Sequence, residues 1–254
     1  MVTMTRKLAA IGLTAALLFT FHTYSAQPAY AAGKTVPAIG LPLEGLEAWY
    51  KLDEEEGSIT AADSSGNGHD APAVSGTWMP TGGVDGGALT LNGTSQMIQP
   101  NTSDSTFLKN AFSVHSAAFW FQADDTASRQ VLYERGGNTA GMAVQLNGNK
   151  LEAAVANAGV MNVVSIDFTD TASWHHVVAS FNNGVLRLYL DGQLAGEKLA
   201  GYTSVSSALN EAGIGARYGV DAFGGSKGEL GFMANWTMFV CIRRQLYLLR
   251  KRSE

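Results

Sequence analysis

The feature that most restricts the fold of this 254-residue chain is a series of tight-turn dipeptides between short apolar runs. Asn147-Gly148, Asn183-Gly184 and Asp191-Gly192 each separate two runs in which apolar and polar residues alternate. Asn-Gly and Asp-Gly favour the two-residue turns of β-hairpins, because these turns need positive φ angles. Long stretches of helical periodicity are missing from residues 46–232. The sequence therefore predicts an all-β protein of antiparallel strands.

Further strand patterns extend this prediction over most of the chain. LEAWYKL (46–52), GALTLNG (87–93) and SVHSAAFWFQA (113–123) are apolar runs bounded by turn residues. The chain also contains 29 glycines, which is roughly 11% against a usual value of about 7%. Turn signals about every 8–12 residues are typical of two antiparallel sheets packed as a sandwich.

Composition and charge narrow the class of protein. With 46% hydrophobic and 15% charged residues, the chain can bury a core. Its net charge of −5 argues against a nucleic-acid partner, because such binders are usually basic. Its one cysteine, Cys241, excludes an internal disulfide framework and a cysteine-rich metal centre.

The N-terminus has the three parts of a secretory signal peptide in order. Arg6 and Lys7 precede the apolar run LAAIGLTAALLFTF, and Ala29-Tyr30-Ala31 follows as a small-residue cleavage site. The run is shorter than the about 20 residues that span a membrane. We predict a signal peptide over 1–31, a flexible lead-in over 32–45, and a secreted, extracellular or cell-surface protein without a membrane span after cleavage.

Four segments of the body resemble the laminin-G-like, concanavalin A-like jelly-roll domains of secreted bacterial proteins. They are LEAWYKLDEEEGSITAADSSGNGHDAPAVSG (46–76), GVDGGALTLNG (83–93), WHHVVASFNNGVLRLYLDGQLAG (174–196) and EAGIGARYG (211–219). The resemblance covers roughly 46–232 and implies an antiparallel two-sheet jelly-roll sandwich over that range.

The chain departs from this family after Phe232. The family usually closes with an F-x-G-x-I/L-D-D-V-R-I-Y strand, whereas residues 233–254 read MANWTMFVCIRRQLYLLRKRSE, an atypical basic tail. A shifted reading frame of suitable codons restores the family pattern, which indicates a frameshift and a longer protein with downstream domains. Two alternatives stay open: a native basic amphipathic segment, or a closing strand formed by MFVCI, since backbone hydrogen bonds do not depend on side-chain identity.

No catalytic motif stands out in the body. The E-x-D-x-x-E strand of related glucanases is missing, and Glu54, Glu55 and Glu56 are consecutive residues at a turn. On a strand, His175 and His176 face opposite sides and cannot chelate one ion. We therefore predict that the chain is not an enzyme and that any catalytic domain lies outside it.

The loop DSSGNGHD (63–70) is the candidate metal site. Carboxylate, amide and carbonyl oxygens in a glycine-containing loop suit Ca²⁺, and the resemblance implies a structural calcium at Asp63 and Asn67. The family completes this site with an aspartate of the closing strand, which this chain lacks. The alternative is an Asx turn in which Asp63 and Asn67 cap their own backbone.

Ligand binding is the remaining class of function. Trp49, Trp120 and Trp174 lie within strand patterns and are predicted to be core. Trp78, between turn residues, is predicted to be an exposed platform for a sugar. Candidate ligand-binding residues beside Trp78 are Tyr133, Arg135 and Tyr218.

We therefore predict a secreted, non-catalytic, lectin-like module that binds a polysaccharide or glycoconjugate. Two alternatives are the N-terminal fragment of a modular glycoside hydrolase and a cell-surface domain that binds another protein.

Overall fold

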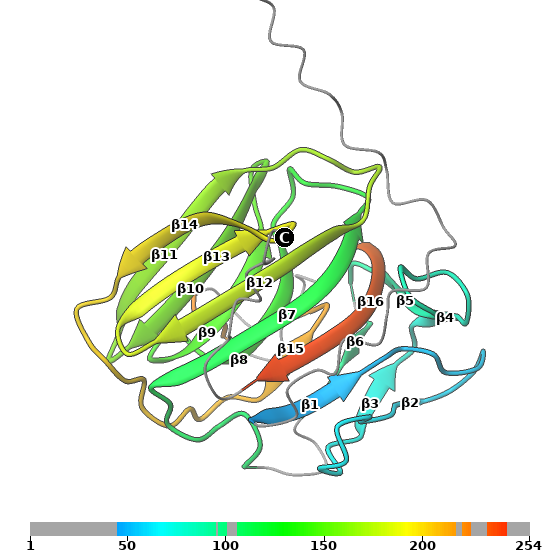
Figure 1. Ribbon diagram of the computed structural model, residues 1–254, viewed down its shortest axis with the longest axis horizontal. Coiled ribbons are helices and arrows are strands. Elements are labelled where there is room, and N and C mark those ends of the chain that lie inside the picture. The colour runs from blue at the N-terminus through cyan, green and yellow to red at the C-terminus, as the bar shows by residue number, and fades with distance from the viewer. Residues whose placement is uncertain (1–44, 95, 101–105, 217–219, 225–232, 243–254) are drawn as a thin grey trace, which may run out of the picture. The chain divides into compact units, whose positions relative to one another are not determined.

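The computed structural model describes residues 45–94, 96–100, 106–216, 220–224 and 233–242. The predicted signal peptide, residues 32–44 of the predicted lead-in, and Tyr218 lie outside the described residues. All regular elements of the described residues are strands, and they form two antiparallel sheets (Figure 1). The prediction of an all-β, antiparallel two-sheet sandwich is confirmed.

The first sheet has the strand order β14-β13-β12-β7-β16-β5-β4, and β1 also pairs with β16. Figure 1 shows β13, β12, β7, β16 and β1 side by side in this order. Its strands are β1 (Leu46–Tyr50), β4 (Thr77–Met79), β5 (Ala88–Asn92), β7 (Val114–Ala123), β12 (His175–Asn182), β13 (Val185–Leu190), β14 (Gln193–Leu199) and β16 (Met233–Ile242).

The second sheet has the order β11-β10-β9-β8-β15-β6-β3-β2. The strands at the β2 end of this sheet have two to four residues, whereas those at the β11 end have seven or eight. Its strands are β2 (Thr60–Ala61), β3 (Ala71–Val74), β6 (Met97–Ile98), β8 (Gln130–Gly136), β9 (Ala140–Leu146), β10 (Lys150–Asn157), β11 (Val160–Asp167) and β15 (Ala212–Ile214).

The hairpin turns follow the predicted dipeptides with one shift and one addition. Asn183-Gly184 and Asp191-Gly192 both have positive φ angles and join their strands directly. In the β9–β10 hairpin the two positive φ angles belong to Gly148 and Asn149, one residue later than predicted. Ala158-Gly159 makes a fourth turn of this kind between β10 and β11. Positive φ at both turn positions matches the twist of the paired strands.

Alternation along the strands places the core between the two sheets. In β1, the side chains of Leu46, Ala48 and Tyr50 are buried, and the residues between them are half-buried. The cluster of buried residues is shared by both sheets and includes Phe119 of the first sheet and Tyr133 of the second. Burial of this apolar surface is the main term that stabilises the fold.

β16 occupies the middle of the first sheet. It pairs with β7 from Ala234 to Ile242, with a register shift between Thr237 and Phe239. On the other edge, Met233–Trp236 pair with β5 and Phe239–Ile242 pair with β1. The strand begins at the first residue of the segment predicted as an atypical tail. The backbone of β16 thus pairs as expected for the alternative in which MFVCI forms the closing strand. The frameshift itself stays a prediction.

Among the described residues, none forms a helix long and apolar enough to cross a membrane.

Candidate functional site

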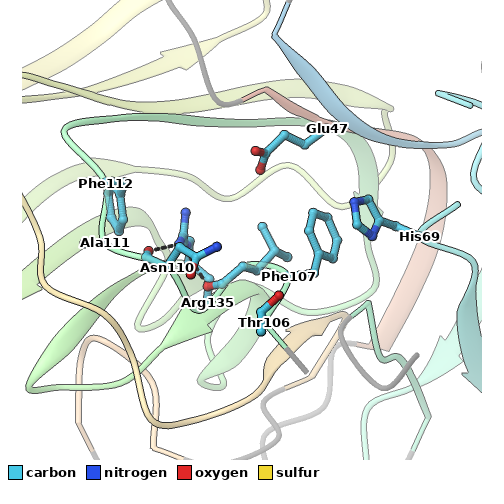
Figure 2. A pocket seen from close by; sticks show the side chains of 9 residues that line it. Glu47, His69, Thr106, Phe107, Asn110, Ala111, Phe112 and Arg135 are labelled. Carbon is cyan, nitrogen blue, oxygen red and sulfur yellow. Dashed lines mark hydrogen bonds between the residues drawn. The ribbon is translucent and has the colours of Figure 1, made fainter. Parts of the chain in front are cut away.

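A pocket of about 150 Å³ lies where β1, the loop of residues 63–70 and the loop of residues 106–112 come together (Figure 2). One polar side chain, Arg135, reaches it from β8. The residues that line the pocket are Glu47, His69, Thr106, Phe107, Leu108, Asn110, Ala111, Phe112 and Arg135.

Glu47 and His69 form the first wall of the pocket, and the carboxylate of Asp63 holds this wall in place. Its Oδ1 accepts hydrogen bonds from the backbone N–H groups of Trp49 and Ser65, both at 2.9 Å. Its Oδ2 accepts from the Ser65 hydroxyl at 2.8 Å and from the His69 N–H at 3.0 Å. Burial raises the pKa of Asp63, but these hydrogen bonds outweigh burial and hold the pKa below its usual value. Asp63 thus fastens the loop to β1 and places His69.

Asn67 and Tyr50 complete this wall. The Asn67 side-chain amide donates to the carbonyl oxygens of Leu46 and Glu47, at 2.9 and 3.0 Å. The Tyr50 hydroxyl donates to the carbonyl of His69 at 2.6 Å. These bonds fix the backbone on either side of the pocket, so that Glu47 and His69 face it.

The arrangement of Asp63 and Asn67 does not fit a calcium ion without a change of structure. Four donors already occupy the two oxygens of the Asp63 carboxylate, and each carboxylate oxygen accepts about two bonds. The described residues contain no group of three or more His, Cys, Asp or Glu that could hold a metal. The hydrogen bonds are those of the Asx-turn alternative, which we now expect in place of the predicted calcium site.

The loop of residues 106–112 forms the second wall of the pocket, and Arg135 of β8 holds this loop in place. Its side chain is 4% exposed, and it donates to the carbonyls of Leu108 at 3.0 Å and Asn110 at 2.8 Å. Its guanidinium also lies over the ring of Phe112, 4.2 Å from the centroid. Leu108 has a left-handed backbone with a φ angle of 61°, which costs free energy for a residue with a bulky side chain. The bonds from Arg135 offset that cost.

Behind Arg135 lies a buried polar chain. Arg135 NH1 is 3.0 Å from Nδ1 of His115, and Nε2 of His115 is 2.9 Å from the Tyr133 hydroxyl. A guanidinium only donates, so Nδ1 of His115 accepts and its proton is on Nε2. Tyr133 is fully buried, and its predicted place at a ligand surface is wrong, because β8 turns this side chain into the core.

The two walls meet through a ring contact. The rings of His69 and Phe107 stack with centroids 3.7 Å apart and planes 4° from parallel, as Figure 2 shows. Around this pair are the Glu47 carboxylate, the Thr106 hydroxyl and the Asn110 amide. The pocket therefore offers hydrogen-bonding groups of several kinds beside a flat apolar edge.

Trp78 is not the exposed platform that the sequence predicts. Its side chain is 4% exposed, and its indole N–H donates to the carbonyl of Ser58 at 2.7 Å. The residues around it read as a loop, but they form β4, which pairs with β5 at Leu89 and turns the indole inward. The prediction of exposure is corrected.

The other tryptophans also differ from their predicted burial. Trp49, Trp120 and Trp174 are half-buried rather than core residues. Trp49 and Trp120 lie on the outward positions of β1 and β7, and Trp174 directly precedes β12. The prediction for the two adjacent histidines is confirmed: His175 contacts Phe168 and His176 contacts Trp120 on the opposite face of β12.

The sequence predicted Arg135 to bind ligand and the loop of residues 63–70 to bind metal; the structure places both beside the pocket, where they hold its walls. Glu47, His69 and Phe107, which form the walls, were not predicted. Glu47 is the outward residue of a predicted strand and His69 belongs to the loop predicted to bind metal. Their approach to Phe107 depends on contacts between segments far apart in sequence, which no local motif signals.

The fold and the pocket define a β-sandwich with a ligand-sized hollow at the junction of its loops. A family model described as the concanavalin A-like lectin/glucanases superfamily matches residues 91–232, more than half of the chain. The chain belongs to this superfamily, in its laminin-G-like branch, and the predicted resemblance is confirmed. No curated protein sequence matches the chain.

Three of the solved structures that resemble this chain are domains of larger proteins. Domain 4 of AbnA, an extracellular GH43 arabinanase from Geobacillus stearothermophilus solved with arabinotriose, is 16% identical, with 80% of this chain and 94% of that domain covered and a TM-score of 0.56. The botulinum neurotoxin serotype D ligand-binding domain, solved with N-acetylneuraminic acid, is 13% identical, with 81% and 49% covered and a TM-score of 0.58. The binding domain of Paraclostridial Mosquitocidal Protein 1 is 17% identical, with 81% and 50% covered and a TM-score of 0.58.

This chain spans about half the length of the toxin binding domains. At these identities the likeness shows the fold alone.

Proposed function

We propose that the chain is a secreted, non-catalytic module that binds a glycan, with one sugar residue entering the pocket between Glu47 and Phe107. The observation that carries the proposal is the composition of this pocket. A carboxylate, an amide and a hydroxyl surround the stacked rings of His69 and Phe107. Sites for small polar ligands combine a few placed polar groups with apolar and aromatic walls in the same way.

The chemistry of a sugar ring matches these groups. Glu47 accepts hydrogen bonds from neighbouring hydroxyls, and the side chain of Asn110 both donates and accepts. The C–H groups of the sugar pack against the apolar lining that Phe107, Leu108 and Phe112 contribute. The volume of about 150 Å³ is below the roughly 300–1,000 Å³ of pockets for drug-sized ligands. The pocket therefore suits one sugar residue, with the rest of the glycan outside.

The charges favour binding over hydrolysis. Glycosidases of the common mechanisms use two carboxyl groups about 5–9.5 Å apart across the scissile bond. Of the residues that line this pocket, Glu47 alone carries a carboxylate. Arg135, the one lining cation, is committed to carbonyls of the loop that it supports.

The comparisons support a glycan as ligand and a location outside the cell. An arabinanase domain and a toxin domain of the same fold were solved with arabinotriose and with N-acetylneuraminic acid. The arabinanase is an extracellular enzyme. The basic and apolar N-terminal segment described above is the sequence feature that supports export.

The test is a screen of immobilised glycans, followed by calorimetric titration of each one that binds. Asn110→Ala and Glu47→Gln should each weaken binding about 5–30-fold, because each removes or weakens hydrogen bonds worth about 1–2 kcal/mol. Neither side chain is fully buried, so the fold should persist, as thermal melting can confirm. The matched control is Asp124→Asn, an exposed loop aspartate outside the pocket.

Two outcomes would overturn the proposal. The first is binding that neither pocket variant weakens. The second is binding to a protein but to no glycan, which would favour the adhesion alternative.

A further inference from the structure

A second pocket, of about 260 Å³, lies on the outward side of β1 and shares no lining residue with the first. It is lined by Trp49 at the end of β1, by Lys51 and Asp53 just after it, and by Asp85 and Gly86 of the loop between β4 and β5. The pocket thus combines one aromatic ring, one cation and two carboxylates. None of these residues has been assigned a role by the function proposed above.

The floor of this pocket is built tightly by glycines. The Gly87 N–H donates to Oδ1 of Asp53 at 2.7 Å. A Cβ atom on Gly86 would lie 2.4 Å from the same oxygen, and the φ angle of Gly86 is +87°. A Cβ atom on Gly87 would lie 2.1 Å from the carbonyl oxygen of Leu52. Only glycine allows this close approach, and the approach fixes the direction of the Asp53 carboxylate.

The aromatic wall already holds an ammonium group. Nζ of Lys51 lies over the ring of Trp49, 4.7 Å from its centroid. The face of an indole attracts cations through its quadrupole, and carboxylates nearby strengthen the preference for positive charge. The buried indole N–H of Trp49 has no acceptor among the described residues. Lys51 itself is exposed, so a ligand can displace it.

We propose that this second pocket binds a sugar that carries a free amine. The ammonium group of the ligand takes the place of the Lys51 ammonium on the Trp49 ring. Asp85 and the second oxygen of Asp53 accept hydrogen bonds from the ammonium and from the neighbouring hydroxyls. The site differs from the first pocket in place and in charge preference, so it adds a class of ligand to the proposed function.

The experiment compares three β-1,4-linked tetramers by calorimetric titration of the purified full chain. They are built from glucosamine, N-acetylglucosamine and glucose, so that the ring is shared and the amine is free, blocked or absent. The free amine should bind about tenfold tighter than the other two, because it alone gains the cation–π and charge-assisted contacts. Higher salt should reduce this preference.

Two variants make the test specific. Asp85→Asn changes an exposed side chain and should abolish most of the preference for the free amine. Lys51→Ala removes the internal ammonium and should strengthen binding of the glucosamine tetramer. A residue that merely stabilised the loop would not give a gain of affinity on removal. Asp124→Asn is the matched control for charge.

Three results would overturn the inference: equal affinity for the three tetramers, unchanged preference in Asp85→Asn, or weaker binding in Lys51→Ala, which would indicate an anionic ligand instead. The first pocket is tested separately by Glu47→Gln. That variant should leave the preference for the free amine unchanged, so failure of one proposal is distinguished from failure of the other.

Discussion

The imidazole of His69 lies flat against the phenyl ring of Phe107, with centroids 3.7 Å apart. Asp63 places His69 through a hydrogen bond, and Phe107 belongs to the loop of residues 106–112 that Arg135 supports. The contact therefore joins two walls that have separate anchors, one in the first sheet and one in the second. Loss of either anchor should therefore change the pocket.

Asp63→Ala should destabilise the protein by about 2–4 kcal/mol, because four hydrogen bonds to one carboxylate are lost and backbone N–H groups are left without acceptors. The free energy of unfolding in urea measures this. Asp124→Ala, at an exposed loop position, should change stability by less than about 0.5 kcal/mol. Equal effects of the two changes would contradict the role of Asp63.

The stabilising effect of Asp63 should depend on pH. The folded-state pKa of Asp63 is below its ordinary value of 3.8, so the folded state binds fewer protons than the unfolded state near that pH. The contribution is fully present above pH 3.8 and is lost as the pH falls through the folded pKa. Urea titrations at a series of pH values should show the gap between wild type and Asp63→Ala constant near neutrality and narrowing in acid. A gap that stays constant into strong acid would argue against it.

Calcium should not raise the melting temperature, because donors already occupy both oxygens of Asp63. A site would add about 2.7 kcal/mol when free calcium is about 100 times its Kd. Thermal melts in EDTA and in millimolar calcium measure the difference. A clear upward shift, lost in Asn67→Ala, would restore the predicted calcium site.

Arg135→Met should release the loop of residues 106–112. It removes the donors to Leu108 and Asn110 and leaves the buried Leu108 carbonyl without this donor, at a cost of about 2–4 kcal/mol. Limited proteolysis should then cut this loop in the native state. Arg187→Met is the control: its exposed pair with Glu197 should be worth less than about 1 kcal/mol. Protection of the loop equal to that of wild type would count against the anchor.

Trp78→Phe should lower the melting temperature and leave glycan affinity unchanged. The substitution keeps an aromatic ring in the core but removes the N–H that bonds to Ser58. Affinity is measured on folded protein below the melting range. A selective loss of affinity at unchanged stability would mean that Trp78 contacts the ligand after all.

The sequence predicted the fold well because hairpin turns and strand faces are specified by residues that are close together in the sequence. Turn dipeptides such as Asn183-Gly184 specify hairpins through the φ angles of two residues, and alternation specifies which face of a strand is buried. The prediction that Trp78 is exposed was wrong because the local signal is missing there. β4 has three residues, too few for alternation to register, and its inward face is set by pairing with β5.

The candidate site was predicted only in part. Asp63 and Asn67 are recognisable because an Asx turn is a local pattern, and the structure gives them the task of holding β1. Glu47 and Phe107 are far apart in the sequence, and their approach follows from sheet pairing and loop contacts. A single sequence carries no signal for such a contact.

The position of β16 affects when the first sheet can form during synthesis. About 110 residues separate the end of β7 from Met233, which at roughly 5–20 residues per second takes about 5–20 s of translation. Until then, β1, β5 and β7 have no central partner, and their ladder edges are open to other chains. A protein cut before Met233 would therefore have a gap inside the sheet rather than a shorter edge.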